Sequence, residues 1–176
     1  MSGAINYLCS KYLYMESRKK AARYERVIQQ LEGLLTKTAD PVARMATVAA
    51  ILSHKFDYFF WCGFYMLKGE KLIVGPYQGP VACQVLEGRG VCLEAVNRKS
   101  TIVVPNVHEF PGHIACDSRS NSEIVVPVFN VKGEILAVLD VDSREFGAFD
   151  ETDTTHLERI AGLICQRQLI TNDHQD

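Results

Sequence analysis

Three cysteines lie in polar, Gly-rich stretches where a thiol could do chemistry. Cys116 is near the middle of residues 112–123, a polar stretch that leads into an apolar run. A thiol on a loop that a strand holds in place suits nucleophilic or redox chemistry, because it is both accessible and positioned. Cys83 and Cys92 lie upstream, and each alone is a weaker signal, since a free cysteine is often a small core residue. For Cys116 the alternative is an inert, partly buried thiol.

A zinc site is a second interpretation of the same residues. His113-x-x-Cys116 has the spacing of a ligand pair, and Cys83 and Cys92 could complete a set of four ligands. The gap between Cys83 and Cys92 is too long for a C-x₂₋₄-C pair, so only one half of the set has the usual spacing. We therefore expect no metal ion and no other cofactor.

Three carboxylates are expected to converge at one end of a sheet. Asp140 and Asp142 are at alternate positions after an apolar run, so both side chains point to the same face of a strand. Glu123 opens the preceding strand of the same expected hairpin, seven residues after Cys116. Clustered carboxylates repel one another unless a cation or a proton lies among them, so the set suits an ammonium-bearing ligand or a carboxyl that donates a proton. The alternative is a solvated strand end.

Aromatic residues upstream could supply the apolar wall of such a pocket. Trp61 and Tyr65 lie in a β-prone stretch and could contact a small apolar group of a ligand, or simply pack in the core. Cys62 lies in the same stretch and is expected in the core. Cys9 and Cys165 have no sequence context that favours a function.

Two helices are expected before the sheet and one after it. Apolar residues recur at i, i+3, i+4 and i+7 between about residues 16 and 35, which predicts an amphipathic helix. Asp40 can cap a second helix, with a proline in its first turn. Asp150 can cap the last helix, with Asp153 as an acid in its first turn. Residues 1–15 show no clear period and are treated as an N-terminal arm of uncertain structure.

Strand-like segments account for most of the remaining chain. They are expected at residues 58–67, 71–74, 82–85, 101–104, 123–129 and 134–141, with a short helix at 91–99. Short turns join the first two strands and the last two, so the sheet should be mostly antiparallel, with the N-terminal and C-terminal helices packed on one face. The pattern predicts an α+β fold of about six strands, in one domain over residues 1–176.

The composition argues against some classes of partner. The 176 residues are 47% hydrophobic and 23% charged, and the net charge of -2 gives no electrostatic reason to expect nucleic acid or an anionic membrane as a partner. No apolar run approaches the ~20 residues that span a bilayer, and no secretory signal is visible. We therefore expect a cytoplasmic protein, whose thiols stay reduced unless they are catalytic.

Five segments together resemble the free methionine-(R)-sulfoxide reductases, which are stand-alone GAF-fold enzymes. The segments are Gly75-Pro76-Tyr77-Gln78-Gly79-Pro80-Val81-Ala82-Cys83, Gly88-Arg89-Gly90-Val91-Cys92, Gly112-His113-Ile114-Ala115-Cys116-Asp117, Ser120-Asn121-Ser122-Glu123-Ile124-Val125 and Leu139-Asp140-Val141-Asp142-Ser143. Several motifs in the right order make the resemblance specific to this family rather than to GAF domains in general. It runs from about Trp61 to Phe149, and implies a single GAF-like domain.

The resemblance implies a role for each residue singled out above. Cys116 resembles the nucleophile that attacks the sulfoxide sulfur, releases methionine and becomes a sulfenic acid. Cys83 resembles the cysteine that resolves this acid as a disulfide, with Cys92 as an alternative or second resolving cysteine. The residues that resemble the acids binding the substrate ammonium and protonating the sulfoxide oxygen are Glu123, Asp140 and Asp142. Trp61 and Tyr65 resemble the wall around the methyl group.

The resemblance also implies partners. It predicts free methionine sulfoxide as the substrate and thioredoxin as the reductant, for an oxidoreductase that acts on sulfur with a disulfide as acceptor. It leaves a homodimer open. The alternative is a GAF module that binds a small ligand, or senses oxidants through its thiols, without turnover. We expect no attached output domain, which counts against a sensor.

Overall fold

The structure is a computed structural model that describes the backbone of residues 2–113 and 116–166, and the side chains of these ranges from residue 15 onward. The helices are α1 (Ser2–Leu34), α2 (Pro41–Lys55), α3 (Val91–Arg98) and α4 (Glu151–Leu163), with the 3₁₀ helices η1 (Leu35–Lys37) and η2 (Val107–Glu109). The strands are β1 (Trp61–Lys68), β2 (Lys71–Gln78), β3 (Val85–Leu86), β4 (Ile102–Val104), β5 (Ser122–Phe129) and β6 (Ile135–Ser143). None of the described helices is long and apolar enough to cross a membrane.

The six strands form one antiparallel sheet in the order β3-β2-β1-β6-β5-β4. β1 and β2 form one hairpin and β5 and β6 form another, and the two hairpins join where β1 pairs with β6. At this join Trp61 lies opposite Asp142, and Gly63 lies opposite Asp140. On the other side of β6, Glu123 lies opposite Asp142. The register therefore gathers these residues at one end of three neighbouring strands.

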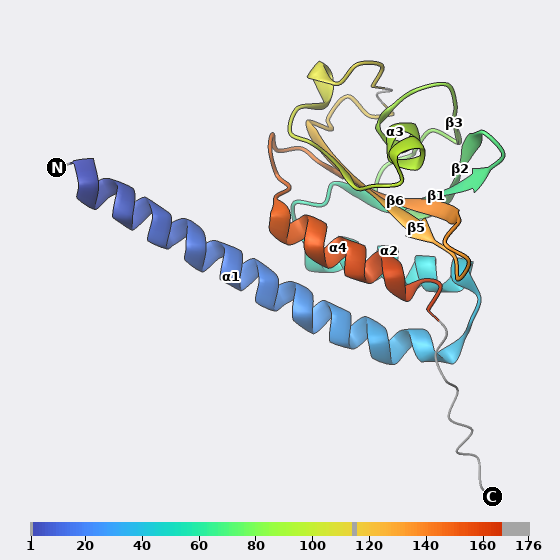
Figure 1. Ribbon diagram of the computed structural model, residues 1–176, viewed down its shortest axis with the longest axis horizontal. Coiled ribbons are helices and arrows are strands. Elements are labelled where there is room, and N and C mark those ends of the chain that lie inside the picture. Colours follow the sequence, from blue (N-terminus) through green and yellow to red (C-terminus); the bar gives the residue numbers. More distant parts are fainter. Residues whose placement is uncertain (1, 114–115, 167–176) are drawn as a thin grey trace, which may run out of the picture.

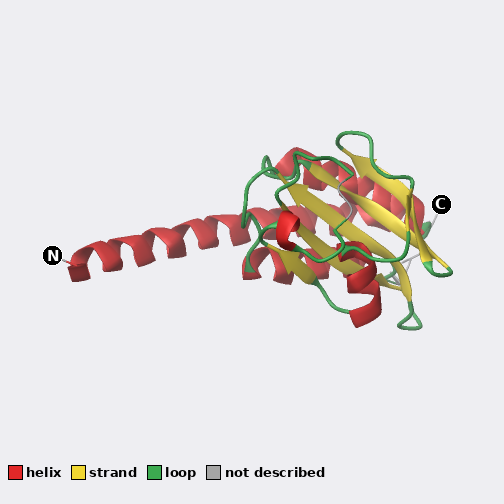
Figure 2. Cartoon of the chain, turned by 90° about the horizontal axis from the view of Figure 1, so that it is seen from above, coloured by secondary structure: helices red, strands yellow, loops and turns green. Residues whose placement is uncertain are grey.

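The two faces of the sheet are covered by different elements (Figure 1, Figure 2). On one face α1, α2 and α4 pack over a core that includes Cys62 and Phe64, both fully buried. On the other face α3 and the long loops pack over Trp61 and Tyr65. Successive residues of a strand point to opposite faces, so Asp140 shares the second face with the two aromatic residues.

The two helix caps predicted from the sequence are confirmed. The Asp40 carboxylate accepts a hydrogen bond from the Ala43 N–H at 2.8 Å, which fixes the start of α2. The Asp150 carboxylate accepts from the Thr152 N–H at 2.8 Å, and the Asp150 N–H donates to the Asp153 carboxylate at 2.8 Å. This reciprocal pair is a capping box that fixes the start of α4.

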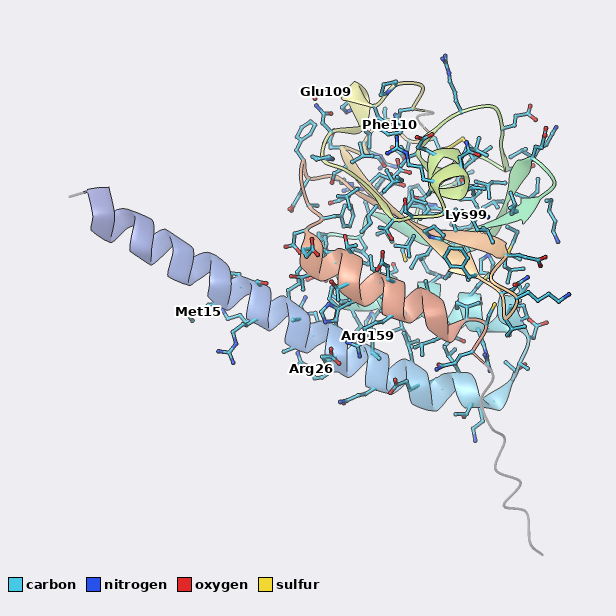
Figure 3. The ribbon with its side chains drawn as sticks, viewed as in Figure 1. Met15, Arg26, Lys99, Glu109, Phe110 and Arg159 are labelled. Carbon is cyan, nitrogen blue, oxygen red and sulfur yellow. A yellow bond between two sulfur atoms is a disulfide. The ribbon has the colours of Figure 1, made fainter. Side chains whose placement is uncertain are left out.

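The predicted α+β fold, with N-terminal and C-terminal helices on one face, is confirmed, but α1 is longer than its sequence pattern indicated. The helix begins at Ser2, and its N-terminal part projects beyond the sheet (Figure 1). Met15 lies on the projecting part and is 48% exposed (Figure 3). A helix with no core to face needs no apolar period, so residues 2–15 can be helical without showing one.

The outer strands also differ from the expected segments. β2 continues past Val74 through Pro76. Pro76 is tolerated because it lies past the outer pairing of β2: β3 pairs with Leu72 and Ile73, and the Val74 N–H donates to the Gln84 carbonyl at 3.0 Å just before it. The strand expected at residues 82–85 is correspondingly reduced to the two residues of β3.

A buried carboxyl ties α1 to α4. Asp153 has no exposed surface, and its Oδ1 accepts hydrogen bonds from the hydroxyls of Tyr24, at 2.8 Å, and Tyr58. Its Oδ2 accepts from the Asp150 N–H and forms an ion pair with Lys20. Both oxygens of this buried carboxylate therefore have partners, and the partners come from segments far apart in the sequence.

Candidate functional site

A pocket opens on the second face of the sheet, between α3 and the loops around it. The space between its walls, with the open mouth included, is about 630 Å³. Seven of the eight site residues predicted from the sequence line it: Trp61, Tyr65, Cys92, Cys116, Glu123, Asp140 and Asp142. The eighth, Cys83, follows the lining residue Ala82 but is not itself part of the lining.

A disulfide joins Cys83 to Cys116. Their Cα atoms are 5.5 Å apart although the residues are 33 positions apart in the sequence. Cys116 is exposed and Cys83 is half-buried. The Tyr65 hydroxyl donates a hydrogen bond to the Cys83 carbonyl at 3.1 Å, which holds the segment carrying Cys83 against the sheet. The fold therefore keeps these two sulfur atoms within bonding reach of each other.

Cys92 lies in the helix expected at residues 91–99, whereas Cys83 and Cys116 lie in loops. It lies in the first turn of α3, is 5% exposed, and is a free thiol that donates a hydrogen bond to Glu123 Oε1 at 3.9 Å. Burial, and then the carboxyl groups of Asp140 and Glu123, raise the pKa of this thiol well above its ordinary value. Cys92 therefore stays protonated at neutral pH and is a weak nucleophile.

The arrangement of four zinc ligands weighed from the sequence does not form. Two of its sulfur atoms, those of Cys83 and Cys116, are bonded to each other. The third, from Cys92, contacts Glu123 instead. The His113-x-x-Cys116 spacing therefore does not indicate a ligand pair here, because the cysteine it contains is committed to the disulfide.

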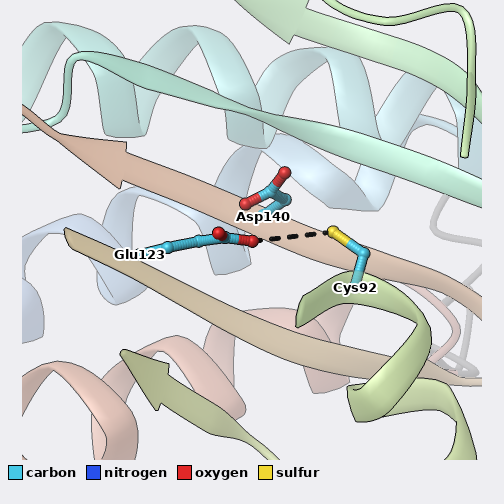
Figure 4. Close-up of side chains that lie close together, drawn as sticks. All are labelled: Cys92, Glu123 and Asp140. Atoms are coloured by element: carbon cyan, nitrogen blue, oxygen red, sulfur yellow. Dashed lines mark hydrogen bonds between the residues drawn. The ribbon is translucent and has the colours of Figure 1, made fainter. Parts of the chain in front are cut away.

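The three predicted carboxyl groups lie together on the floor of the pocket, and Figure 4 shows Glu123 beside Asp140. Glu123 is 5% exposed and Asp140 6%. Burial raises the pKa of both carboxyl groups well above their ordinary values; Asp140 and Asp142 raise that of Glu123 further, and Asp142 raises that of Asp140 further. Burial also raises the pKa of Asp142, to about 7, against the opposing effect of a hydrogen bond with Ser120. At neutral pH the floor therefore offers two protonated carboxyls and one that is partly ionised.

Two buried polar atoms of the pocket have no hydrogen-bond partner in the part of the chain that the structure describes. They are Trp61 Nε1 and Asp140 Oδ1. A buried polar atom without a partner costs about 1–3 kcal/mol, and such atoms are rare in folded proteins. Both atoms are therefore available to a bound molecule, which would recover this cost.

Trp61 forms a fixed aromatic wall. Its ring stacks on Tyr65, at a centroid distance of 5.7 Å, and on Tyr77, at 5.3 Å. Gly79 lets the chain pass close to the indole, since a Cβ there would lie 2.8 Å from Trp61 Cδ1 and its φ of +131° favours glycine. The indole is held from several sides and presents an apolar surface to the pocket.

Two basic side chains line the pocket that the sequence analysis did not assign to it. Arg89 packs on Gly112, where a Cβ would lie 2.5 Å from Arg89 Cδ. His113, weighed only as a zinc ligand, places its Nε2 3.8 Å from Glu123 Oε2, and burial lowers the pKa of its imidazole. Arg89 had a sequence signal, because it is a charged residue between two glycines. No local signal places His113 beside Glu123.

Comparisons with known proteins identify the family. Residues 34–166 match the family model described as GAF domain. The chain is 45% identical over 154 residues to GAF domain-containing protein A of Dictyostelium discoideum, and the match covers 86% of this chain and 96% of that protein. It is 36% identical over 159 residues to the free methionine-R-sulfoxide reductase of Saccharomyces cerevisiae, covering 86% of this chain and 88% of that protein.

A solved structure agrees with these sequence matches. The free methionine-R-sulfoxide reductase from Neisseria meningitidis, determined in complex with its substrate, superposes with a TM-score of 0.78 at 43% identity, over 82% of this chain and 87% of that one. The chain belongs to the free methionine-R-sulfoxide reductase family of GAF domains.

Proposed function

We propose that the protein reduces free L-methionine-(R)-sulfoxide to methionine, with Cys116 as the nucleophile. The observation that carries the proposal is an exposed cysteine on a pocket whose floor holds buried carboxyl groups with raised pKa values. Sulfoxide reduction needs a thiol and a proton donor from the protein. The relatives named as free methionine-R-sulfoxide reductases support the same assignment. No observation favours a binding module without turnover.

The pocket has a complementary contact for each part of this substrate. The methyl group would pack on Trp61. The ammonium would pair with Asp142, which of the three acids is the most readily ionised at neutral pH. The substrate carboxylate would meet the Arg89 guanidinium at the pocket wall. A free amino acid presents both charged groups, whereas a residue within a peptide does not, so the two contacts together would select the free form.

Burial of the acids removes a conflict between them and the thiol. Ionised carboxylates near a thiol disfavour the thiolate, which is the nucleophilic form. Because burial keeps Glu123 and Asp140 protonated, they do not oppose negative charge on Cys116. The same two carboxyl groups can donate a proton to the sulfoxide oxygen as the sulfur–oxygen bond breaks.

The proposed reaction balances in three steps. The Cys116 sulfur attacks the sulfoxide sulfur, and the oxygen passes to Cys116 as a sulfenic acid while methionine leaves, so the thiol loses the two electrons that the sulfoxide gains. The Cys83 thiol then attacks the sulfenic acid, which forms the disulfide and releases water. A dithiol reductant, for which we propose thioredoxin, supplies two electrons and two protons to restore both thiols.

The experiment that tests the activity is turnover of resolved sulfoxide diastereomers with dithiothreitol and a methionine readout. We expect reduction of the R form only, and no turnover in Cys116→Ser. Cys165→Ser is the matched control, because it removes a free thiol that lies just after α4, outside the pocket lining. Failure to reduce the R form, or an unchanged rate in Cys116→Ser, would contradict the proposal.

The role of Cys83 is tested separately with thioredoxin as the reductant. Cys83→Ser should release about one methionine per protein and then stop, because the sulfenic acid has no partner thiol. A rapid-quench measurement of methionine released per chain separates this single turnover from a dead enzyme. Normal recycling in Cys83→Ser, together with lost recycling in Cys92→Ser, would assign the resolving role to Cys92 instead.

A further inference from the structure

Three buried side chains with metal-ligating atoms meet on the floor of the pocket (Figure 4). Cys92 comes from the first turn of α3, Glu123 from the start of β5 and Asp140 from β6. One ligand atom from each lies within 4.8 Å of the other two, and Cys92 Sγ is 3.9 Å from Glu123 Oε1. Three separate elements of the fold therefore bring one thiol and two carboxyl groups to a single point.

The cluster is incomplete as it stands, because one of its oxygens is unpaired. Asp140 is 6% exposed, and its Oδ1 is buried without a hydrogen-bond partner among the described residues. Figure 4 shows the Asp140 carboxyl beside the contact between Cys92 and Glu123. A bound cation would satisfy this oxygen, and would also stabilise the ionised form of the carboxyl groups, which burial disfavours.

We propose that Cys92, Glu123 and Asp140 form a binding site for a zinc ion. Zinc takes thiolate, imidazole and carboxylate ligands in a tetrahedral arrangement, with Zn–S of about 2.3 Å and Zn–O of about 2.1 Å. That geometry places sulfur and oxygen about 3.6 Å apart. The 3.9 Å between Cys92 Sγ and Glu123 Oε1 is close to this separation. Mg²⁺ and Ca²⁺ prefer oxygen ligands alone, so the Cys92 sulfur disfavours both ions at this site.

Three protein ligands leave one position of the zinc tetrahedron open to water, as in zinc sites with three protein ligands. One sulfur and two oxygens from the protein make a set that suits zinc among the common cellular divalent ions. Binding forms one zinc–sulfur and two zinc–oxygen bonds, and it releases to solvent the protons of the Cys92 thiol and of the Glu123 and Asp140 carboxyl groups. No atom changes oxidation state, so the step needs no reductant or oxidant.

The zinc site goes beyond the proposed reduction and does not depend on it. Cys92 is a free thiol while Cys83 and Cys116 form the disulfide, so all three ligands are present in the oxidised protein. A zinc ion there would occupy the floor of the pocket and exclude a substrate from it. The oxidised protein also suits the test, because the two cysteines of the disulfide cannot bind the metal.

The test is a titration of the disulfide-intact protein with zinc sulfate in competition with a chromogenic chelator. We expect one zinc ion per chain, and no competition from Mg²⁺. Cys92→Ser and Asp140→Asn should each weaken zinc binding at least about 10-fold. Cys165→Ser also removes a free thiol but not a proposed ligand, so it should leave the affinity unchanged.

X-ray absorption at the zinc edge of the wild-type complex gives a readout that needs no variant to fold. We expect one sulfur at about 2.3 Å, with oxygen atoms completing the shell. A shell without sulfur, wild-type affinity in Cys92→Ser, or the absence of stoichiometric zinc would overturn the proposal. Sulfoxide turnover measured in the presence of the chelator is a separate result, so failure of the zinc site and failure of the proposed reductase activity are distinguishable.

Discussion

Two buried acid clusters in this protein differ in whether their oxygens have partners. Between α1 and α4, Asp153 has no exposed surface, and its oxygens accept hydrogen bonds from two tyrosine hydroxyls, a backbone N–H and Lys20. On the pocket floor, Asp140 is 6% exposed, and one of its oxygens has no partner within the described ranges. The two acids are about equally buried, so burial alone does not separate a structural acid from one that serves a site.

The pairing of each acid indicates its role. A buried carboxylate with charged and hydrogen-bonding partners stabilises the folded state, and removing one member leaves the other buried groups without a partner. The pocket carboxyls have raised pKa values, because the folded protein opposes their ionisation. These carboxyl groups therefore lower the free energy of unfolding at neutral pH. Groups that destabilise the fold in this way are typical of binding and catalytic sites.

The largest expected effect is on stability, from the paired cluster. Asp153→Ala should lower the free energy of unfolding by about 3–5 kcal/mol, because it leaves the hydroxyls of Tyr24 and Tyr58 without their acceptor and removes one of the two carboxylate partners of Lys20. Urea unfolding followed by the fluorescence of Trp61 measures the loss. Asp57→Ala, at an exposed acid, is the matched control and should change little. A decrease in the free energy of unfolding below about 1 kcal/mol would contradict the structural role that the comparison gives to Asp153.

The next effect should appear in substrate binding and not in stability. Asp142→Asn leaves the substrate ammonium unpaired, so we expect binding to weaken by about 2–5 kcal/mol. The free energy of unfolding at neutral pH should not fall, since the substitution removes a carboxyl whose ionisation is disfavoured in the fold. Substrate affinity from isothermal titration and stability from urea unfolding, on the same variant, separate the two effects. A variant that binds substrate normally but is less stable would show that Asp142 has a structural role, like Asp153.

The smallest expected effect is a dependence of stability on pH. Folding raises the pKa of Asp142 from the ordinary 3.8 to about 7. The folded state therefore binds more protons in that range, and the contribution is complete below about pH 4 and lost as the pH rises through 7. Asp142 should contribute at most about 1.4 kcal/mol per pH unit to the slope, and Glu123 and Asp140, whose pKa values are also raised, add contributions of the same sign. Urea unfolding across the range measures the slope, and Asp142→Asn should reduce it by the contribution of one group; an equally steep slope in the variant would assign it to the other groups.

The placement of the pocket acids could be predicted from the sequence because it depends on local rules. Alternation along one strand puts Asp140 and Asp142 on the same face, and the short β5–β6 hairpin puts Glu123 opposite Asp142. The helix caps follow from equally local spacing. Each of these predictions needs only a few neighbouring residues to be right.

Other features could not be predicted because they depend on how distant segments pack. Cys92 is buried because α3 packs down onto the sheet, which the sequence of the helix does not specify. Asp153 could be identified as a first-turn acid, but its burial depends on Tyr24, 129 positions away. The first turns of α1 showed no period because that part of the helix has no core to face.

The disulfide has one partner in the pocket lining, Cys116, and one outside it, Cys83. Because Cys116 is exposed as well as part of the lining, the disulfide borders both the pocket and the solvent. The proposed dithiol reductant would therefore contact the bond from the solvent side, and the pocket would need to admit only a molecule as small as an amino acid.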